Sequence, residues 1–171
     1  MSKEVAKQYV QNQIVKVSQI LEKNIYDKDG RELIKRDIFI KIKKYLDNFI
    51  SEGKEPRWVL MPGLRGVGKT TILSQIFFEY EKQKERIVYF SLDEVTKILN
   101  LTLKDVLDAY QEFIGESFEN LKKPIILLLD EVHYDVNWTY VLKKVKSYFS
   151  CKIFLRITPV PHIAKPLQAF L

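Results

Sequence analysis

A segment near the middle of the chain, Gly63 to Thr70, fits the pattern G-x-x-x-x-G-K-[ST]. Residues 58–61 form a short apolar run before it, which suits a buried strand, and residues 71–78 continue after it as an apolar stretch without Pro or Gly, which suits a helix. A glycine-rich turn followed by a surface lysine is the alternative, but it leaves both flanking elements unexplained. The sequence therefore predicts a phosphate-binding loop, or P-loop.

The residue types of this loop match the chemistry of phosphate binding. Glycine at positions 63 and 68 permits unusual backbone angles and places no Cβ between the main chain and a phosphate. The loop N–H groups would face the phosphates at the positive end of a helix that starts near Lys69. Lys69 adds a charge for the β- and γ-phosphates, the Thr70 hydroxyl suits a bridging Mg²⁺, and Thr71 is expected at the α-phosphate. The predicted nucleotide-binding residues are Gly63, Arg65, Gly66, Val67, Gly68, Lys69, Thr70 and Thr71.

A second motif follows the apolar run at 125–129, which ends in Asp130-Glu131. A run that is apolar on both faces indicates a central parallel strand, and ligands of such sheets bind at the carboxyl ends of the strands. We expect Asp130 to hold Mg²⁺ together with Thr70, directly or through water. Glu131 is expected to accept a proton from the water that attacks the γ-phosphate. The alternative is a strand that runs into an acidic turn. With Lys69, Glu131 is predicted to be catalytic.

Composition excludes several other classes of protein. The 171 residues are 46% hydrophobic and 29% charged, as expected of one globular domain. No apolar stretch approaches the length of a membrane span and the first residues lack a signal-peptide core, so we expect a cytoplasmic protein without a membrane partner. The single Cys151 excludes an internal disulfide framework, and His133 and His162 are too few for a zinc site.

Alternating apolar periodicities predict an α/β fold, a parallel sheet between helical layers. Further strands are expected at 87–92 and 152–157, and helices at 5–25, 32–50, 93–100, 103–118 and 138–149. The strand that ends at Asp130 would be separated from the P-loop strand by one inserted neighbour. We expect residues 1–30 to form a helical extension and residues 31–171 the core of a three-layer α/β/α P-loop NTPase sandwich, preceded by N-terminal helices.

Three segments carry a family resemblance: Arg65 to Thr71, Leu129 to Tyr134 followed by Asn137-Trp138, and Tyr89 to Asp93. With them the chain resembles the archaeal and bacterial AAA+-related P-loop ATPases, often called archaeal ATPases, which stand near the STAND group of signal-transduction ATPases. The resemblance covers roughly residues 34–157. It implies an AAA+/ASCE-like sheet, binding of ATP with Mg²⁺, and the site roles given above. His133 is either an orienting group near the γ-phosphate or a hydrogen-bonded structural histidine.

The C-terminal part departs from this family. Members usually follow the fourth strand with a polar sensor residue in a Thr-Gly-Ser-like segment, whereas Ile157 is followed here by Thr158-Pro159. Thr158 is the candidate sensor. The chain ends at Leu171, before a fifth strand, an arginine finger, a helical lid or a C-terminal domain would fit, so the resemblance implies a C-terminally truncated ATPase core. This departure bears on turnover more than on nucleotide binding.

Three functions stay open at this point. The first is an ATP-hydrolysing switch or motor core. The second is a nucleotide-binding module without independent turnover, which acts as a regulatory or DNA-associated adaptor. The third is a nucleic-acid adaptor. The net charge of +6 favours it, and the absence of a recognisable helix-turn-helix with clustered basic residues counts against it. The resemblance, together with the missing Asn-Lys-x-Asp guanine motif, implies ATP rather than GTP. A protein partner or a second copy of the chain completes the expected partners.

Overall fold

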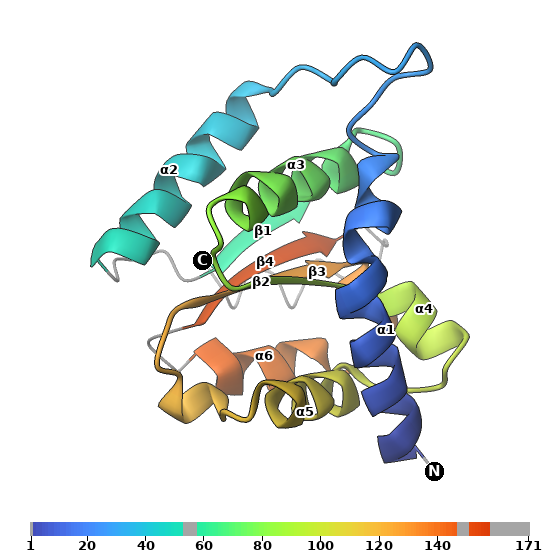
Figure 1. Ribbon diagram of the computed structural model, residues 1–171. Helices are drawn as coiled ribbons and strands as arrows, with labels where there is room; N and C mark the ends of the chain where they lie inside the picture. The colour runs from blue at the N-terminus through green and yellow to red at the C-terminus, as the bar shows by residue number, and fades with distance from the viewer. Residues whose placement is uncertain (1, 53–57, 147–150, 158–171) are drawn as a thin grey trace.

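The computed structural model describes residues 2–52, 58–146 and 151–157, which form a parallel sheet between two layers of helices (Figure 1). The strands are β1 (Trp58–Pro62), β2 (Ile87–Ser91), β3 (Ile125–Asp130) and β4 (Cys151–Ile157), in the spatial order β1-β4-β3-β2. All three neighbouring pairs are parallel. The expected inserted strand is thus β4, which lies between β1 and β3, and the predicted fold class is confirmed.

The helices are α1 (Ser2–Glu22), α2 (Asp37–Glu52), α3 (Lys69–Lys82), α4 (Leu92–Lys97), α5 (Leu103–Ile114) and α6 (Trp138–Lys146), with 3₁₀ turns η1 (Phe118–Asn120) and η2 (Val132–Tyr134). Helices α2 and α3 lie on one side of the sheet, and α5 and α6 lie on the other (Figure 1). Side chains of β3 alternate, so Ile126 and Leu128 join the core under α2 and α3, and Ile125, Leu127 and Leu129 join the core on the side of α5 and α6.

Helix α1 crosses the edge of the sheet at β2 and contacts both layers (Figure 1). Its first half buries Tyr9 and Val10 in the core on the α5 side, and its second half buries Val17 and Leu21 in the core on the α3 side. Between these halves the buried Gln13 donates from Nε2 to the Tyr89 carbonyl of β2, at 3.2 Å. The helix therefore covers a sheet edge that would otherwise expose unpaired backbone groups.

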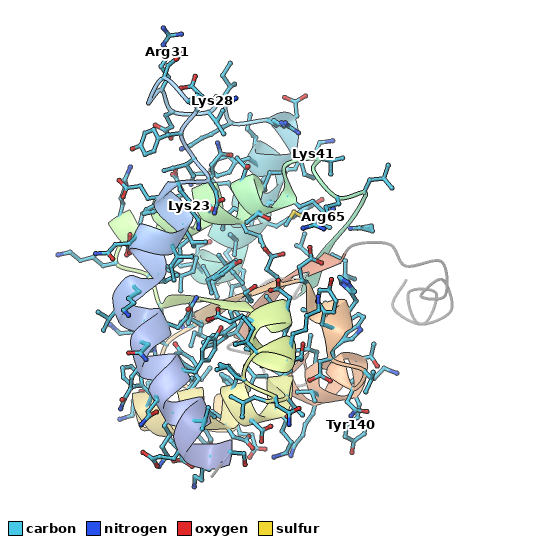
Figure 2. All side chains as sticks on the ribbon, turned by 90° about the vertical axis from the view of Figure 1, so that its right-hand side faces the viewer. Lys23, Lys28, Arg31, Lys41, Arg65 and Tyr140 are labelled. Carbon is cyan, nitrogen blue, oxygen red and sulfur yellow. The ribbon has the colours of Figure 1, made fainter. Side chains whose placement is uncertain are left out.

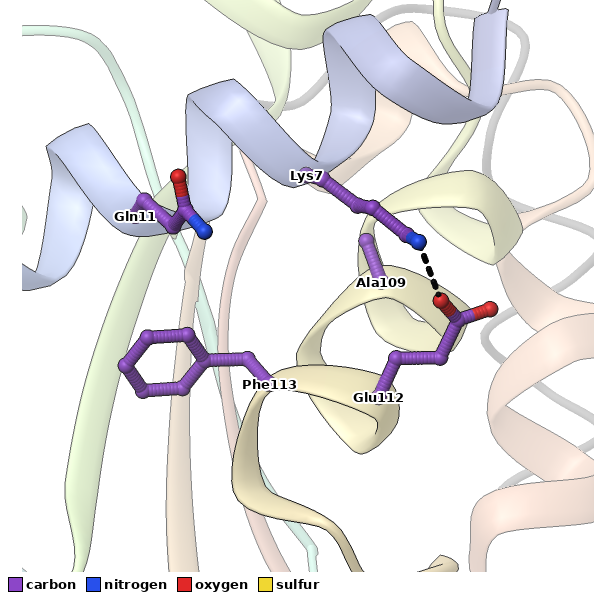
Figure 3. A pocket seen from close by; sticks show the side chains of 5 residues that line it. All are labelled: Lys7, Gln11, Ala109, Glu112 and Phe113. Atoms are coloured by element: carbon purple, nitrogen blue, oxygen red, sulfur yellow. Dashed lines mark ion pairs between the residues drawn. The ribbon is translucent and has the colours of Figure 1, made fainter.

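A cavity of about 200 Å³ lies between side chains of α1 and α5 (Figure 3). Its lining consists of Lys7, Gln11, Ala109, Glu112 and Phe113. The Lys7 ammonium lies 2.9 Å from the Glu112 carboxylate. Hydrogen bonds from Lys3, which has the larger effect, and from Lys7 lower the pKa of Glu112. Because these ion pairs are solvent-exposed, they orient α1 on α5 with little effect on stability.

The helix expected from Glu32 begins only at Asp37. The preceding residues are tied to α3 instead: the Leu33 carbonyl accepts a hydrogen bond from Gln75 Nε2 at 2.8 Å. Lys35 Nζ donates to Glu79 Oε2, also at 2.8 Å, and this bond lowers the pKa of Glu79. Ile34, which the periodicity assigns to the inner face, is 88% exposed. Tertiary contacts along α3 thus override the local helical pattern.

Helix α5 also ends earlier than its apolar pattern indicates. Gly115 follows Ile114 with a left-handed φ of 67° and its N–H bonds back to the last turn, a common way to end a helix. At the other end Thr102 and Asp105 form a reciprocal capping box. The buried Phe118, expected in the helix, lies in η1.

Replacement of Asp135 by Ala is expected to lower the free energy of unfolding by about 2 kcal/mol, because buried donors lose their acceptor. Asp135 is 4% exposed, and its carboxylate accepts the Leu103 N–H at 2.6 Å and the Asn137 N–H at 2.7 Å, which joins the starts of α5 and α6. Thermal unfolding should show a midpoint lower by about 4–8 °C. Asp135→Asn keeps one acceptor oxygen and should lose less. Equal midpoints for the Ala variant and the unaltered chain would contradict the bridging role.

Candidate functional site

The predicted P-loop connects β1 to α3, and Lys69 is the first residue of that helix. Gly68 caps the helix with φ 87° and ψ 18°, a left-handed conformation that favours glycine. A Cβ at this position would also lie 3.3 Å from Arg36 Nη2. Both the backbone angle and the close approach of Arg36 therefore explain why glycine occupies position 68.

The Lys69 side chain folds back along the loop that precedes it. It is 5% exposed, and its ammonium donates to the Gly63 carbonyl and to the Leu64 carbonyl, the latter at 2.6 Å. These bonds compensate the burial of the charge. The ammonium is thereby held beside the backbone of the loop in which phosphate groups are expected.

The two sequence motifs meet in space. Thr70 Oγ1 donates a hydrogen bond to Asp130 Oδ2 at 3.3 Å. Asp130 ends β3 on the same face as Ile126 and Leu128, so strand alternation directs it to the side of α3. A hydroxyl and a carboxylate are hard oxygen donors, which is the ligand chemistry that Mg²⁺ prefers. This pair of residues fits the metal that the sequence implies.

Asp130 is almost fully enclosed, with 2% of its surface exposed, and two further donors hold it. The Tyr89 hydroxyl of β2 donates to Oδ2 at 3.0 Å, and the Glu131 N–H donates to Oδ1 at 2.9 Å. No motif in the sequence marks Tyr89 as a site residue. The alternation of side chains along β2 could have indicated it, because this alternation places the Tyr89 hydroxyl on the same face of the sheet as Asp130.

Glu131 adopts a left-handed backbone with φ 52°, which is uncommon for a residue other than glycine. Its carboxylate Oε2 lies 3.3 Å from His133 Nδ1, and both side chains are largely buried. The His133 ring in turn lies against Tyr134, with 4.3 Å between ring centroids. The predicted base is therefore held in a defined orientation toward His133.

A pocket of about 290 Å³ lies beside the start of α3. Arg36 forms part of its wall and donates from Nη1 to the Val67 carbonyl at 2.9 Å, so it fastens the segment before α2 to the P-loop. No sequence motif marks Arg36 as a site residue, because the apolar pattern places it inside a helix and its partner is distant in the chain. The pocket is lined by Leu33, Ile34, Arg36, Gly68, Thr71, Ile72 and Gln75.

The remaining predicted residues have different surroundings. Arg65, labelled in Figure 2, is exposed, and Val67 is 45% exposed. Thr158 lies outside the described residues. Within the described ranges there is no group of three or more His, Cys, Asp or Glu side chains that could hold a metal ion. The helices in these ranges are also too short or too polar to cross a bilayer.

The sequence is similar to those of known proteins. The family model described as an AAA domain matches residues 55–156, more than half of the chain. The "Uncharacterized protein MJ1637" of Methanocaldococcus jannaschii is 39% identical over 153 residues, which cover 88% of this chain and 30% of the relative. The chain thus spans less than a third of that relative.

Solved structures support the same fold. The structure of C. elegans PCH-2 superposes with a TM-score of 0.54 and 16% identity, covering 86% of this chain and 41% of the other. A crystal structure of a DNA replication initiation factor gives 0.52 and 17%, covering 81% and 44%. The chain belongs to the AAA domain family and is related to the AAA+ P-loop ATPases.

Proposed function

We propose that this chain binds Mg·ATP at the P-loop and hydrolyses the γ-phosphate, as a switch or motor module. The observation that carries the proposal is the Thr70–Asp130 contact of 3.3 Å, between residues that are 60 positions apart. A glycine-rich turn without a binding role would not be expected to contact a buried carboxylate at the end of a central strand. The pair supports a shared cation site beside the loop.

Each residue has a distinct part in this reaction. The loop N–H groups and the Lys69 ammonium bind the phosphates, and Thr70 with Asp130 would hold Mg²⁺, which neutralises phosphate charge when bound. Glu131 takes a proton from the attacking water. The water oxygen forms a bond to the γ-phosphorus as the bond to the β,γ-bridging oxygen breaks, and ADP leaves with that electron pair.

The pocket beside α3 is the proposed place of the adenine base. Its wall combines apolar side chains of Leu33, Ile34 and Ile72 with the polar Gln75, a mixture that suits a flat heterocycle with hydrogen-bonding edges. The P-loop forms the adjoining wall through Gly68 and Thr71. A base in this pocket would stay connected to phosphates in the loop.

A second candidate function is nucleotide binding without independent turnover. The distance of 3.3 Å between Glu131 Oε2 and His133 Nδ1 favours it, because an ion pair with a protonated His133 would leave the carboxylate less available to a water molecule. A partner subunit that supplies an arginine to the γ-phosphate would then be needed, and such an arginine contributes roughly 10³–10⁵ in rate. Both a second copy of the chain and another protein fit this role.

The charge distribution gives less support to nucleic-acid binding. Figure 2 labels Lys23, Lys28 and Arg31, which lie along the connection between α1 and α2. Carboxylates alternate with these cations: Arg31 pairs with Asp29 at 3.9 Å, and the Asp27 carboxylate accepts the Arg31 N–H. An interleaved surface of this kind attracts phosphate backbones weakly.

The decisive experiment titrates ATP with Mg²⁺ and follows the melting temperature and phosphate release together. A rise in melting temperature with Mg²⁺-dependent phosphate release supports the ATPase. A rise in melting temperature without phosphate release supports the binding module. The same titration with GTP is the control for base specificity. If neither ATP nor GTP changes the melting temperature, both candidate functions are wrong.

A further inference from the structure

Three groups from three parts of the fold donate hydrogen bonds to the Asp130 carboxylate. Two of them, the Thr70 hydroxyl and the Glu131 N–H, belong to the motifs described above. The third is the phenol of Tyr89 on β2. We propose that Tyr89 is a positioning residue for the cation ligand Asp130, whose carboxylate it holds in the orientation that Mg²⁺ requires. This inference rests on the proposed function.

The sheet brings Tyr89 to the carboxylate. Ser91 lies opposite Asp130 in the parallel register of β2 and β3, and Tyr89, two residues earlier, is on the same face as Ser91. The long phenol reaches diagonally across this face to Oδ2, with 3.0 Å between the oxygens. A shorter hydroxyl, such as that of serine, would not cover this diagonal.

Burial makes the contact consequential. Tyr89 is 5% exposed and Asp130 is 2% exposed, so water competes poorly for either group. Donors around a buried carboxylate fix its orientation, and a correctly oriented carboxylate is what a divalent cation binds. Thr70 still donates its hydrogen when its oxygen binds a cation, so Thr70 and Tyr89 can hold Oδ2 at the same time.

The phenol is itself held in place from two sides. Its ring belongs to the core that includes Ile72 and Ile76 of α3, and its backbone carbonyl accepts the hydrogen bond from Gln13 of α1. The hydroxyl therefore has little freedom to turn away from Asp130. Groups that orient a metal ligand in this manner commonly change metal affinity by about 10–100-fold when they are removed.

Titration calorimetry of ADP, with Mg²⁺ and with EDTA, tests the inference in Tyr89→Phe, which keeps the ring and removes the hydroxyl. The readout is the ratio of the ADP dissociation constants in EDTA and in Mg²⁺. We expect this ratio to fall by about tenfold relative to the unaltered chain, and the affinity in EDTA to stay unchanged.

Tyr80→Phe is the matched control. Tyr80 lies in the last turn of α3, and its hydroxyl bonds to the Lys43 carbonyl at 3.1 Å and to Asp47 Oδ1 at 2.7 Å, both in α2. This variant should lose stability and keep the ratio. An unchanged ratio in Tyr89→Phe, or an equal fall in both variants, overturns the inference alone. If the unaltered chain gains no ADP affinity from Mg²⁺, the proposed function fails and the inference fails with it.

Discussion

Lys69→Ala is expected to abolish the thermal stabilisation that ATP and Mg²⁺ give to the unaltered chain. A ligand at 100 times its dissociation constant stabilises a protein by about 2.7 kcal/mol. For a chain of this size such a gain raises the melting temperature by about 5–10 °C. Without the ammonium the β- and γ-phosphates lose the buried side-chain charge at the end of the loop, so a melting scan with ATP should overlay the scan without it.

The Lys69 ammonium also bonds to the Gly63 and Leu64 carbonyls, so the variant will differ in stability before any ligand is added. The comparison is therefore the shift caused by ATP within each variant. Lys82→Ala, an exposed change in the last turn of the same helix, should keep the full shift. A normal ATP shift in Lys69→Ala would mean that the nucleotide binds elsewhere.

Glu131→Gln is expected to lower the rate of phosphate release by about 10²–10⁴ and to leave the affinity for ATP nearly unchanged. Glutamine has the size of glutamate but cannot take a proton from water. Single-turnover phosphate release, measured with enzyme in excess over ATP, separates this step from binding. The same preparation should retain its ATP-dependent melting shift.

Glu119→Gln, an exposed carboxylate in the layer of α5 and α6, supplies the matched control and should hydrolyse ATP at the unaltered rate. If Glu131→Gln releases phosphate as fast as the unaltered chain, another group activates the water. An ATP affinity that falls together with the rate would instead assign Glu131 to binding.

The sequence predicts the sheet and the meeting of the two motifs because both are written locally. The run at 125–129 is apolar on both faces, which suits only an inner strand. Asp130 follows this run, so it lies at the carboxyl end of the strand, where the P-loop also lies. The Thr70–Asp130 contact follows from those two placements. Short-range patterns were sufficient for this part of the site.

Contacts between distant segments were beyond the reach of such patterns. The apolar spacing from Glu32 onward predicts a helix, but the Leu33 carbonyl accepts a hydrogen bond from Gln75 of α3, and Lys35 donates one to Glu79 of α3. These bonds hold the segment before Asp37 out of the helix. Arg36 reaches the Val67 carbonyl only because of this segment. Likewise, the left-handed backbone of Glu131 has no signature in the residue type, since glutamate rarely adopts it.

The position of α1 across β2 has a consequence for assembly. One border of the four-stranded sheet is closed by a helix that supplies its own hydrogen-bond donor, Gln13, to the strand. Among the described strands the opposite border is β1, the strand that leads directly into the P-loop. A further strand, from the same polypeptide or from a neighbour, would therefore pair with β1, on the side of the sheet from which the P-loop begins.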